Sequence, residues 1–132
     1  MKKVVLVVAI VFAGALAVGL FLMNATETDQ RDIKKLKTLM LKPGKAHEVC
    51  MILTPDDGLR YEFYVVGSLD FDLHYHLRDK VFYSVKPHGA SRENKVFRPT
   101  FSNDYCLMWV NNHAGPISFK FGYEKIKTAG GP

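Results

Sequence analysis

The sequence predicts an all-β protein: an antiparallel, jelly-roll-like β-sandwich of about seven or eight short strands, preceded by an N-terminal transmembrane helix. Three observations predict this fold class. Short apolar runs with the period of two that is typical of strands follow one another from Ala46 to Tyr123. Segments rich in glycine, proline and asparagine separate these runs. One uncharged apolar run, at residues 4–23, precedes them all.

The apolar run at residues 4–23 has the length of a membrane-spanning helix, because about 20 helical residues cross a ~30 Å hydrocarbon layer. Lys2 and Lys3 precede it and favour a cytoplasmic N-terminus. The rest of the chain then lies outside the cytoplasm, in the periplasm or at the cell exterior. We therefore predict an uncleaved signal anchor at residues 1–23, with cleavage near residues 15–17 as the alternative.

Three alanines of this run share one helix face, because Ala9, Ala13 and Ala17 recur at a spacing of four. Small residues at this spacing allow two helices to approach closely, which predicts homo-oligomerisation through this face. The alternative is that alanine is simply common in export signals.

The remaining chain divides into a juxtamembrane spacer at residues 24–38, a folded domain at residues 39–126 and a flexible tail at residues 127–132. Apolar residues at helical spacing favour a short helix in the spacer. Leu39 to Leu41 alternatively begin the first strand, and Lys42-Pro43-Gly44-Lys45 predicts the turn after it.

The strand pattern of the domain is clearest at Asp70 to Arg78, where apolar and polar residues alternate strictly. Tyr105 to Val110 is apolar on both faces, which predicts a covered central strand. The polar stretch at residues 86–94 contains Pro87 and Gly89 and predicts a loop. The other predicted strands are residues 47–53, 61–66, 81–85, 96–101 (an edge strand, since it holds Pro99) and 117–123.

Cys50 and Cys106 are the two cysteines of the sequence. An exported domain lies in an oxidising compartment, where two cysteines usually pair. The closed loop of about 57 residues then stabilises the fold by roughly 4 kcal/mol in the chain-entropy model. Two free buried thiols and a Cys/His metal site are the alternatives.

Three segments carry a family resemblance. They are Lys42-Pro43-Gly44 ahead of His47-Glu48-Val49-Cys50, then Leu69-Asp70-Phe71-Asp72-Leu73-His74, and Tyr105-Cys106-Leu107-Met108-Trp109-Val110-Asn111. Together they make the stretch from Leu41 to Tyr123 resemble a GOLD domain, the lumenal β-sandwich of the Golgi cargo receptors. The resemblance implies a Cys50–Cys106 disulfide and a domain that binds other molecules and performs no reaction. The receptors carry their membrane helix and coat-binding tail after the domain, so this layout implies a stand-alone, bacterial relative.

His74 and His76 are the sharpest candidate site. At positions i and i+2 of a strand, both imidazoles project from one face, about 7 Å apart along the backbone. Two such histidines chelate Zn or Cu when a third ligand joins them. We predict His113 as the third ligand, with Asp72 and His88 as further candidates; the alternative is a solvated polar face.

Tyr105 and Trp109 project from one face of their predicted strand. One interpretation is a ligand-facing aromatic floor. The alternative is that both side chains pack in the core.

Composition and motifs exclude some functions. The net charge of +5 comes from scattered basic residues without interleaved aromatic residues, which argues against nucleic-acid binding. No serine stands in a nucleophile-elbow motif, so we predict no enzyme activity. Two functions stand: a membrane-anchored extracytoplasmic module that binds a protein, glycan or lipid, with no cofactor, and a periplasmic Zn- or Cu-binding protein that uses His74 and His76.

Overall fold

The structure is a computed structural model that describes residue 33 and residues 35–128. These residues form six strands and no helix, which confirms the predicted all-β class. The predicted anchor at residues 1–23 lies outside the described residues, and so do Ala9, Ala13 and Ala17. Within the described part, no helix is long and apolar enough to cross a membrane. The strands are β1 (Lys37–Leu41), β2 (Ala46–Leu53), β3 (Asp57–Leu77), β4 (Lys80–Phe97), β5 (Asn103–Val110) and β6 (Ile117–Lys127).

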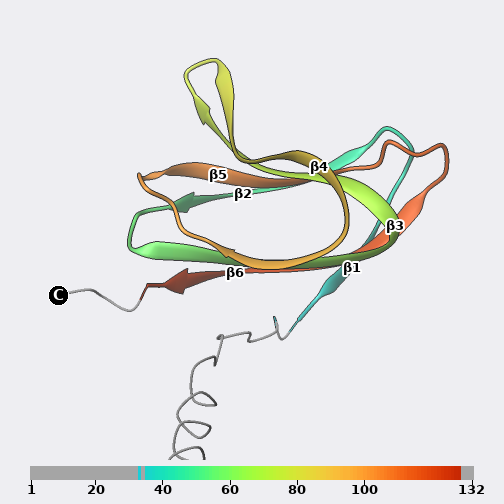
Figure 1. Ribbon diagram of the computed structural model, residues 1–132, viewed down its shortest axis with the longest axis horizontal. Coiled ribbons are helices and arrows are strands. Elements are labelled where there is room, and N and C mark those ends of the chain that lie inside the picture. Colours follow the sequence, from blue (N-terminus) through green and yellow to red (C-terminus); the bar gives the residue numbers. More distant parts are fainter. Residues whose placement is uncertain (1–32, 34, 129–132) are drawn as a thin grey trace, which may run out of the picture. The chain divides into compact units, whose positions relative to one another are not determined.

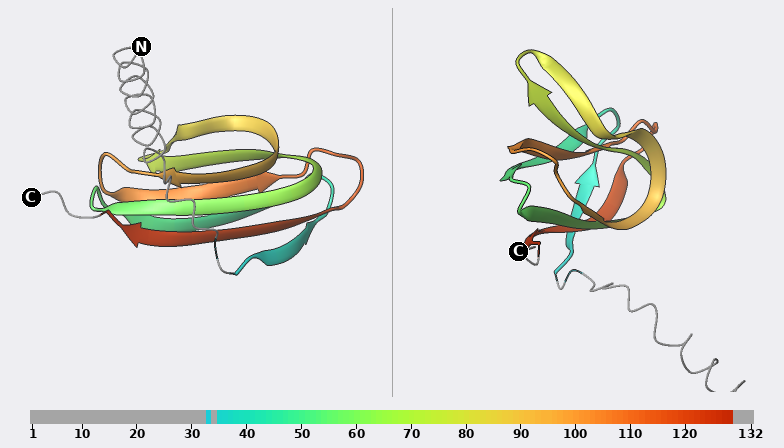
Figure 2. Two further views of the ribbon diagram at one scale, coloured as in Figure 1. Left: turned by 60° about the horizontal axis from the view of Figure 1, so that its bottom comes forward. Right: turned by 60° about the vertical axis from the view of Figure 1, so that its left-hand side comes forward.

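All six strands belong to one antiparallel sheet with the order β1-β6-β3-β5-β2, and β4 pairs with β3. The long strand β3 joins two halves of the sheet. Its first half pairs with β6 from Asp57 to Val65, and its second half pairs with β5 from Asp70 to Tyr75. Between these halves Gly67 has a φ of 95°, where a side chain would be strained. The sheet therefore curls, and β5 and β2 face β6 and β1 across the core (Figures 1 and 2).

The number of strands differs from the expected seven or eight because expected neighbours merge. Strand β3 includes both predicted runs, at residues 61–66 and 70–78, up to Leu77, and the bend at Gly67 does not end it. Strand β4 includes the predicted loop at residues 86–94. Because β4 pairs with β3 alone, its other edge and many of its side chains face solvent, and polar residues are tolerated there.

Aromatic side chains from both halves of the sheet fill the core. Trp109 of β5 is fully buried, and its ring lies 5.1 Å from Phe121 and 5.6 Å from Phe119 of β6. The same ring lies 5.9 Å from Phe63 and 5.5 Å from Phe71, both on β3. One side chain thus holds the two halves together, and each buried aromatic residue of this kind stabilises the fold by about 1.5–3 kcal/mol.

Asp57 fixes the turn between β2 and β3 and has no exposed surface. Its Oδ2 accepts hydrogen bonds from Thr54, 2.8 Å from the backbone N and 3.1 Å from Oγ1. Its Oδ1 accepts a hydrogen bond from Lys127 Nζ at 2.6 Å. The Lys127 ammonium and the Thr54 donors hold the pKa of Asp57 well below its ordinary value of 3.8.

We expect Asp57→Asn to lower the melting temperature at neutral pH, because the amide loses the charge that Lys127 pairs with. A depressed carboxyl pKa gives stability that is present above the unfolded pKa and is lost as pH falls through the folded pKa. The melting temperatures of wild type and variant should therefore begin to converge below about pH 4 and meet only as the pH falls through the lower folded pKa. Thermal unfolding monitored by circular dichroism from neutral pH into acid measures this. Asp56→Asn, at the exposed neighbour, is the matched control, and a difference that stays constant into acid would contradict the assignment.

Candidate metal centre

A cluster of metal-ligating side chains lies on the outer face of the half-sheet formed by β3, β5 and β2. Core residues such as Phe71 and Leu73 point inward on β3, so the residues that alternate with them point outward. Register brings His74 opposite Cys106 of β5, and Cys106 opposite Cys50 of β2. The predicted Cys50–Cys106 disulfide is present and joins these two strands.

His74 is the centre of this cluster and has a side chain that is only 4% exposed. Its Nδ1 donates a hydrogen bond to Asp72 Oδ1 at 2.6 Å. Its Nε2 lies 3.0 Å from Oε1 of Glu48, which β2 contributes. The ring of His76 lies 5.1 Å from the His74 ring and nearly perpendicular to it. Ligand atoms of Glu48, His74, His76 and Cys106 all lie within 4.8 Å of one another.

The buried carboxyl of Asp72 orients His74. Burial raises the pKa of Asp72, and the hydrogen bond from His74 works in the opposite direction. Because Nδ1 is occupied by this bond, Nε2 is the ring nitrogen that points toward Glu48. A carboxylate behind one histidine nitrogen, with the other nitrogen directed at the metal, is the usual arrangement around protein-bound Zn²⁺.

The donor set of the oxidised protein is two imidazoles and one carboxylate. The sulfur of Cys106 is bonded to Cys50, so it does not offer the thiolate that metals bind. Two histidines and one glutamate bind Zn²⁺ in proteins and leave a fourth position for water. The arrangement therefore suits Zn²⁺, with Asp72 as the residue that positions His74.

The structure separates His113 from His74 and His76, which corrects the predicted three-histidine set. His113 lies near the opposite end of the second half of β3, where its Nε2 donates a hydrogen bond to the Ser68 carbonyl at 2.8 Å. Its backbone N donates to Asn111 Oδ1 at 2.9 Å. Glu48 takes the place of His113 in the cluster.

His88, another predicted candidate, also lies elsewhere. Its Nε2 donates to Glu93 Oε1 at 2.5 Å, and its Nδ1 donates to the Lys86 carbonyl at 2.8 Å. These two acceptors raise the pKa of His88, the Lys86 carbonyl most. Its ring meets the edge of the buried Phe71, so it belongs to the inner face of β3 and β4.

Tyr105 and Trp109, predicted to face a ligand, are core residues instead, with 1% and 0% of their surface exposed. Tyr105 donates its hydroxyl hydrogen bond to the Phe101 carbonyl at 2.9 Å. Their shared strand face is the inner one, because β5 lies between β3 and β2 and its inner face covers the aromatic core.

Sequence reasoning missed Glu48, although one signal pointed to it. Glu48 stands two residues before Cys50, so it shares that residue's strand face. A Cys50–Cys106 disulfide fixes the register between their strands, but the pairing of β5 with β3 has no such marker. The pair His74 and Glu48 could therefore not be recognised from spacing alone.

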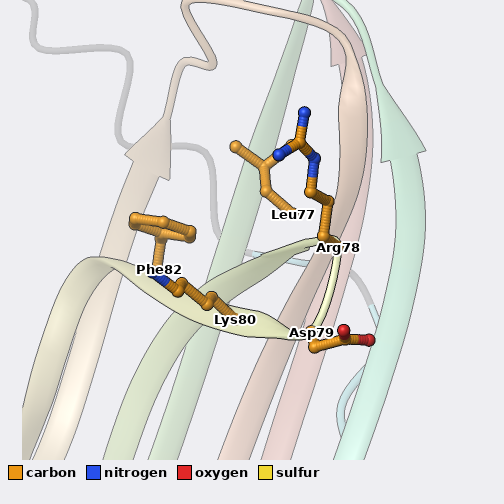
Figure 3. A pocket seen from close by; sticks show the side chains of 5 residues that line it. All are labelled: Leu77, Arg78, Asp79, Lys80 and Phe82. Carbon is orange, nitrogen blue, oxygen red and sulfur yellow. The ribbon is translucent and has the colours of Figure 1, made fainter.

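Beside the metal centre, β3 and β4 continue into an exposed hairpin that projects from the rest of the sheet (Figure 1). His74 pairs with Tyr83 near the place where pairing with β5 ends, and His76 pairs with Val81 on the hairpin itself, so the centre extends onto the β3 arm of the hairpin. Arg78 at the tip has a φ of 55°, an uncommon value for a residue with a side chain. A hollow of about 530 Å³ lies at the tip, and Figure 3 shows the side chains that line it: Leu77, Arg78, Asp79, Lys80 and Phe82.

Comparison with known proteins shows the fold alone. No protein-family model matches the chain, and no curated protein matches it. A solved structure described as the crystal structure of PirA has a TM-score of 0.50 and 16% identity, over 72% of this chain and 98% of that one. A solution structure of a de novo designed double-stranded β-helix has a TM-score of 0.40 and 18% identity, over 69% of this chain and 100% of that one. Neither description names a GOLD domain, so that resemblance stays a prediction.

Proposed function

We propose that this domain is a non-enzymatic metal-binding module that holds one Zn²⁺ ion between Glu48, His74 and His76. The observation that carries the proposal is the buried His74 ring, which Asp72 holds on one side while the other nitrogen faces Glu48 at 3.0 Å. A histidine on a solvated polar face would be exposed, so the burial of His74 between two carboxyl groups favours a specific site. Burying an imidazole and a carboxyl together is costly unless a specific partner compensates both.

The metal-ligating residues come from two strands with β5 between them, which supports a preformed metal site. Glu48 lies on β2, whereas His74 and His76 lie on β3, and each of these strands pairs with β5. Their positions are therefore set by the hydrogen bonds of the sheet and not by a mobile loop. Glu48 and His76 are exposed, which gives an ion a path from solvent to the buried nitrogen of His74.

We also propose that the module works outside the cytoplasm, anchored by residues 4–23, and that its fold is a GOLD-like, jelly-roll-like sandwich. The apolar run behind Lys2 and Lys3 supports the location. The disulfide supports it too, because such bonds persist in oxidising compartments. Two facing half-sheets and the paired cysteines support the sandwich.

Isothermal titration of the oxidised protein with Zn²⁺ tests the metal proposal. We expect one ion per chain, and we expect His74→Ala/His76→Ala to weaken binding by more than about 100-fold, since losing a residue that only orients a ligand already costs about 10–100-fold. Asp72→Asn should fall in that lower range. His113→Ala is the matched control and should bind as wild type does. Equal Zn²⁺ affinity in wild type and the double variant would end the proposal.

A second candidate function is an interaction module whose contact surface is the β3–β4 hairpin. The observation that favours it is the exposure of four large apolar side chains on one short hairpin. Arg78 and Lys80 flank them, so the surface suits a protein partner with an apolar patch and acidic neighbours. The four side chains are Leu77, Val81, Phe82 and Tyr83.

A further inference from the structure

We propose that the Cys50–Cys106 disulfide controls the metal centre, because its reduction adds the Cys106 thiolate to the donors of Glu48, His74 and His76. This inference rests on the proposed function and adds a redox input to the same site. It starts from one row of paired residues across three strands. Cys50 lies opposite Cys106, and Cys106 lies opposite His74.

The position of the Cys106 sulfur supports its role as a ligand. It lies within 4.8 Å of the donor atoms of Glu48, His74 and His76. Donor atoms that share one tetrahedral Zn²⁺ lie roughly 3–4 Å apart, given bonds of about 2.0–2.3 Å. The four groups therefore need only side-chain adjustments, without a change in strand register, to bind a single ion.

The two redox states offer different donor sets. A disulfide sulfur is not a thiolate, so the oxidised site has two nitrogens and one oxygen and keeps an open position. The reduced site has two nitrogens, one oxygen and one sulfur, which is a closed four-coordinate set. Because thiolate is a strong ligand for Zn²⁺, the reduced form should bind it more tightly.

The exposure of the two cysteines favours reduction of the disulfide by attack on Cys50. Cys50 is exposed, whereas Cys106 is only 3% exposed, so an external thiolate reaches Cys50 first. Attack on the Cys50 sulfur breaks the bond between the two cysteines, and Cys106 leaves as the thiolate beside His74. A second thiol of the reductant then releases Cys50. The protein gains two electrons and two protons, the two reductant thiols end as one disulfide, and metal binding displaces the proton of Cys106 to solvent.

Reciprocal linkage gives the test. If Zn²⁺ binds the reduced form more tightly by some factor, it shifts the disulfide equilibrium toward the dithiol by the same factor. Wild-type protein is equilibrated in glutathione redox buffers with and without free Zn²⁺ that a chelator holds constant. Acid quenching, alkylation and intact mass then give the reduced fraction. We expect a shift of at least about fivefold, the lower end of usual coupling factors.

His74→Ala/His76→Ala is the decisive variant and should show no shift, while His113→Ala should shift as wild type does. A shift that persists in the double variant would mean that the thiols bind Zn²⁺ without this centre, which overturns the inference. No shift in a wild-type protein whose oxidised form binds Zn²⁺ would overturn the redox control and leave the proposed function standing. Absence of Zn²⁺ binding in both states would overturn both.

Single-cysteine variants supply a second measurement that does not need reduction. In Cys50→Ala the Cys106 thiol is free without a reductant, and Co²⁺ serves as a spectroscopic substitute for Zn²⁺. We expect thiolate-to-cobalt charge-transfer absorption in this variant and none in Cys106→Ala, which keeps the other thiol. Retained near-ultraviolet circular dichroism shows that each variant is folded. Equal absorption in both folded variants would contradict the assignment of Cys106 as the ligand.

Discussion

Trp109→Ala should lower the free energy of unfolding by about 3–5 kcal/mol, the usual cost of removing a fully buried large aromatic side chain. The indole of Trp109 contacts aromatic residues of both half-sheets, including Phe71 and Phe119. Its loss leaves a cavity at the place where the halves meet. Since small domains are stable by about 5–15 kcal/mol in total, this one substitution removes a large share. Urea unfolding followed by far-ultraviolet circular dichroism measures the change.

Trp109→Phe should cost much less than Trp109→Ala, for a reason specific to this site. Trp109 Nε1 is buried and has no hydrogen-bond partner among the described residues. A buried donor without a partner costs about 1–3 kcal/mol, and phenylalanine removes that donor while filling most of the volume. Val66→Ala is the surface control, since Val66 is 80% exposed and should change stability by less than about 0.5 kcal/mol. A phenylalanine variant as unstable as the alanine variant would contradict this account.

Replacing both cysteines, as Cys50→Ala/Cys106→Ala, should lower the free energy of unfolding by roughly 4 kcal/mol in the presence of a chelator. The sequence separation of 56 residues closes a long loop in the unfolded chain, which is the main source of the effect in the chain-entropy model. Urea unfolding of the oxidised wild type and the variant gives the difference. Wild type after reduction is the matched control, because its cysteines remain but the covalent link is gone.

The two cysteine states also connect stability with metal binding. Zn²⁺ at about 100 times its dissociation constant stabilises a folded protein by about 2.7 kcal/mol. The reduced wild type should therefore recover much of the lost stability when Zn²⁺ is added, whereas the double-alanine variant should recover less. A variant without cysteines that is as stable as the oxidised protein would show that the disulfide does not support the fold.

The features that were predicted correctly are the two faces of one strand and the pairing of the cysteines. The alternation from Asp70 to Leu77 gave the inner and outer faces of β3, and Phe71 and Leu73 are indeed fully buried. The cysteine pairing followed from a rule about compartments. Both inferences need only local spacing or a simple count of residues.

The parts that could not be predicted depend on pairing between distant strands. The polar segment at residues 86–94 resembled a loop because it contains Pro87 and Gly89, which an edge strand such as β4 tolerates. The third residue of the cluster, predicted at His113, is instead Glu48. The strands that lie beside β3 are determined by the whole sheet and not by local spacing. The alternative for His74 was a solvated polar face, yet its side chain is only 4% exposed and lies between Asp72 and Glu48.

The closure of the sheet by its first and last strands has a consequence for how the domain is made. Lys37 of β1 pairs with Phe121 of β6, and the first half of β3 also pairs with β6. Contacts between positions so far apart along the chain form late, and proteins dominated by them fold in roughly milliseconds to seconds. A growing chain therefore has no complete sheet to form until β6 has left the ribosome. Its core strands therefore stay accessible to chaperones until that point of synthesis.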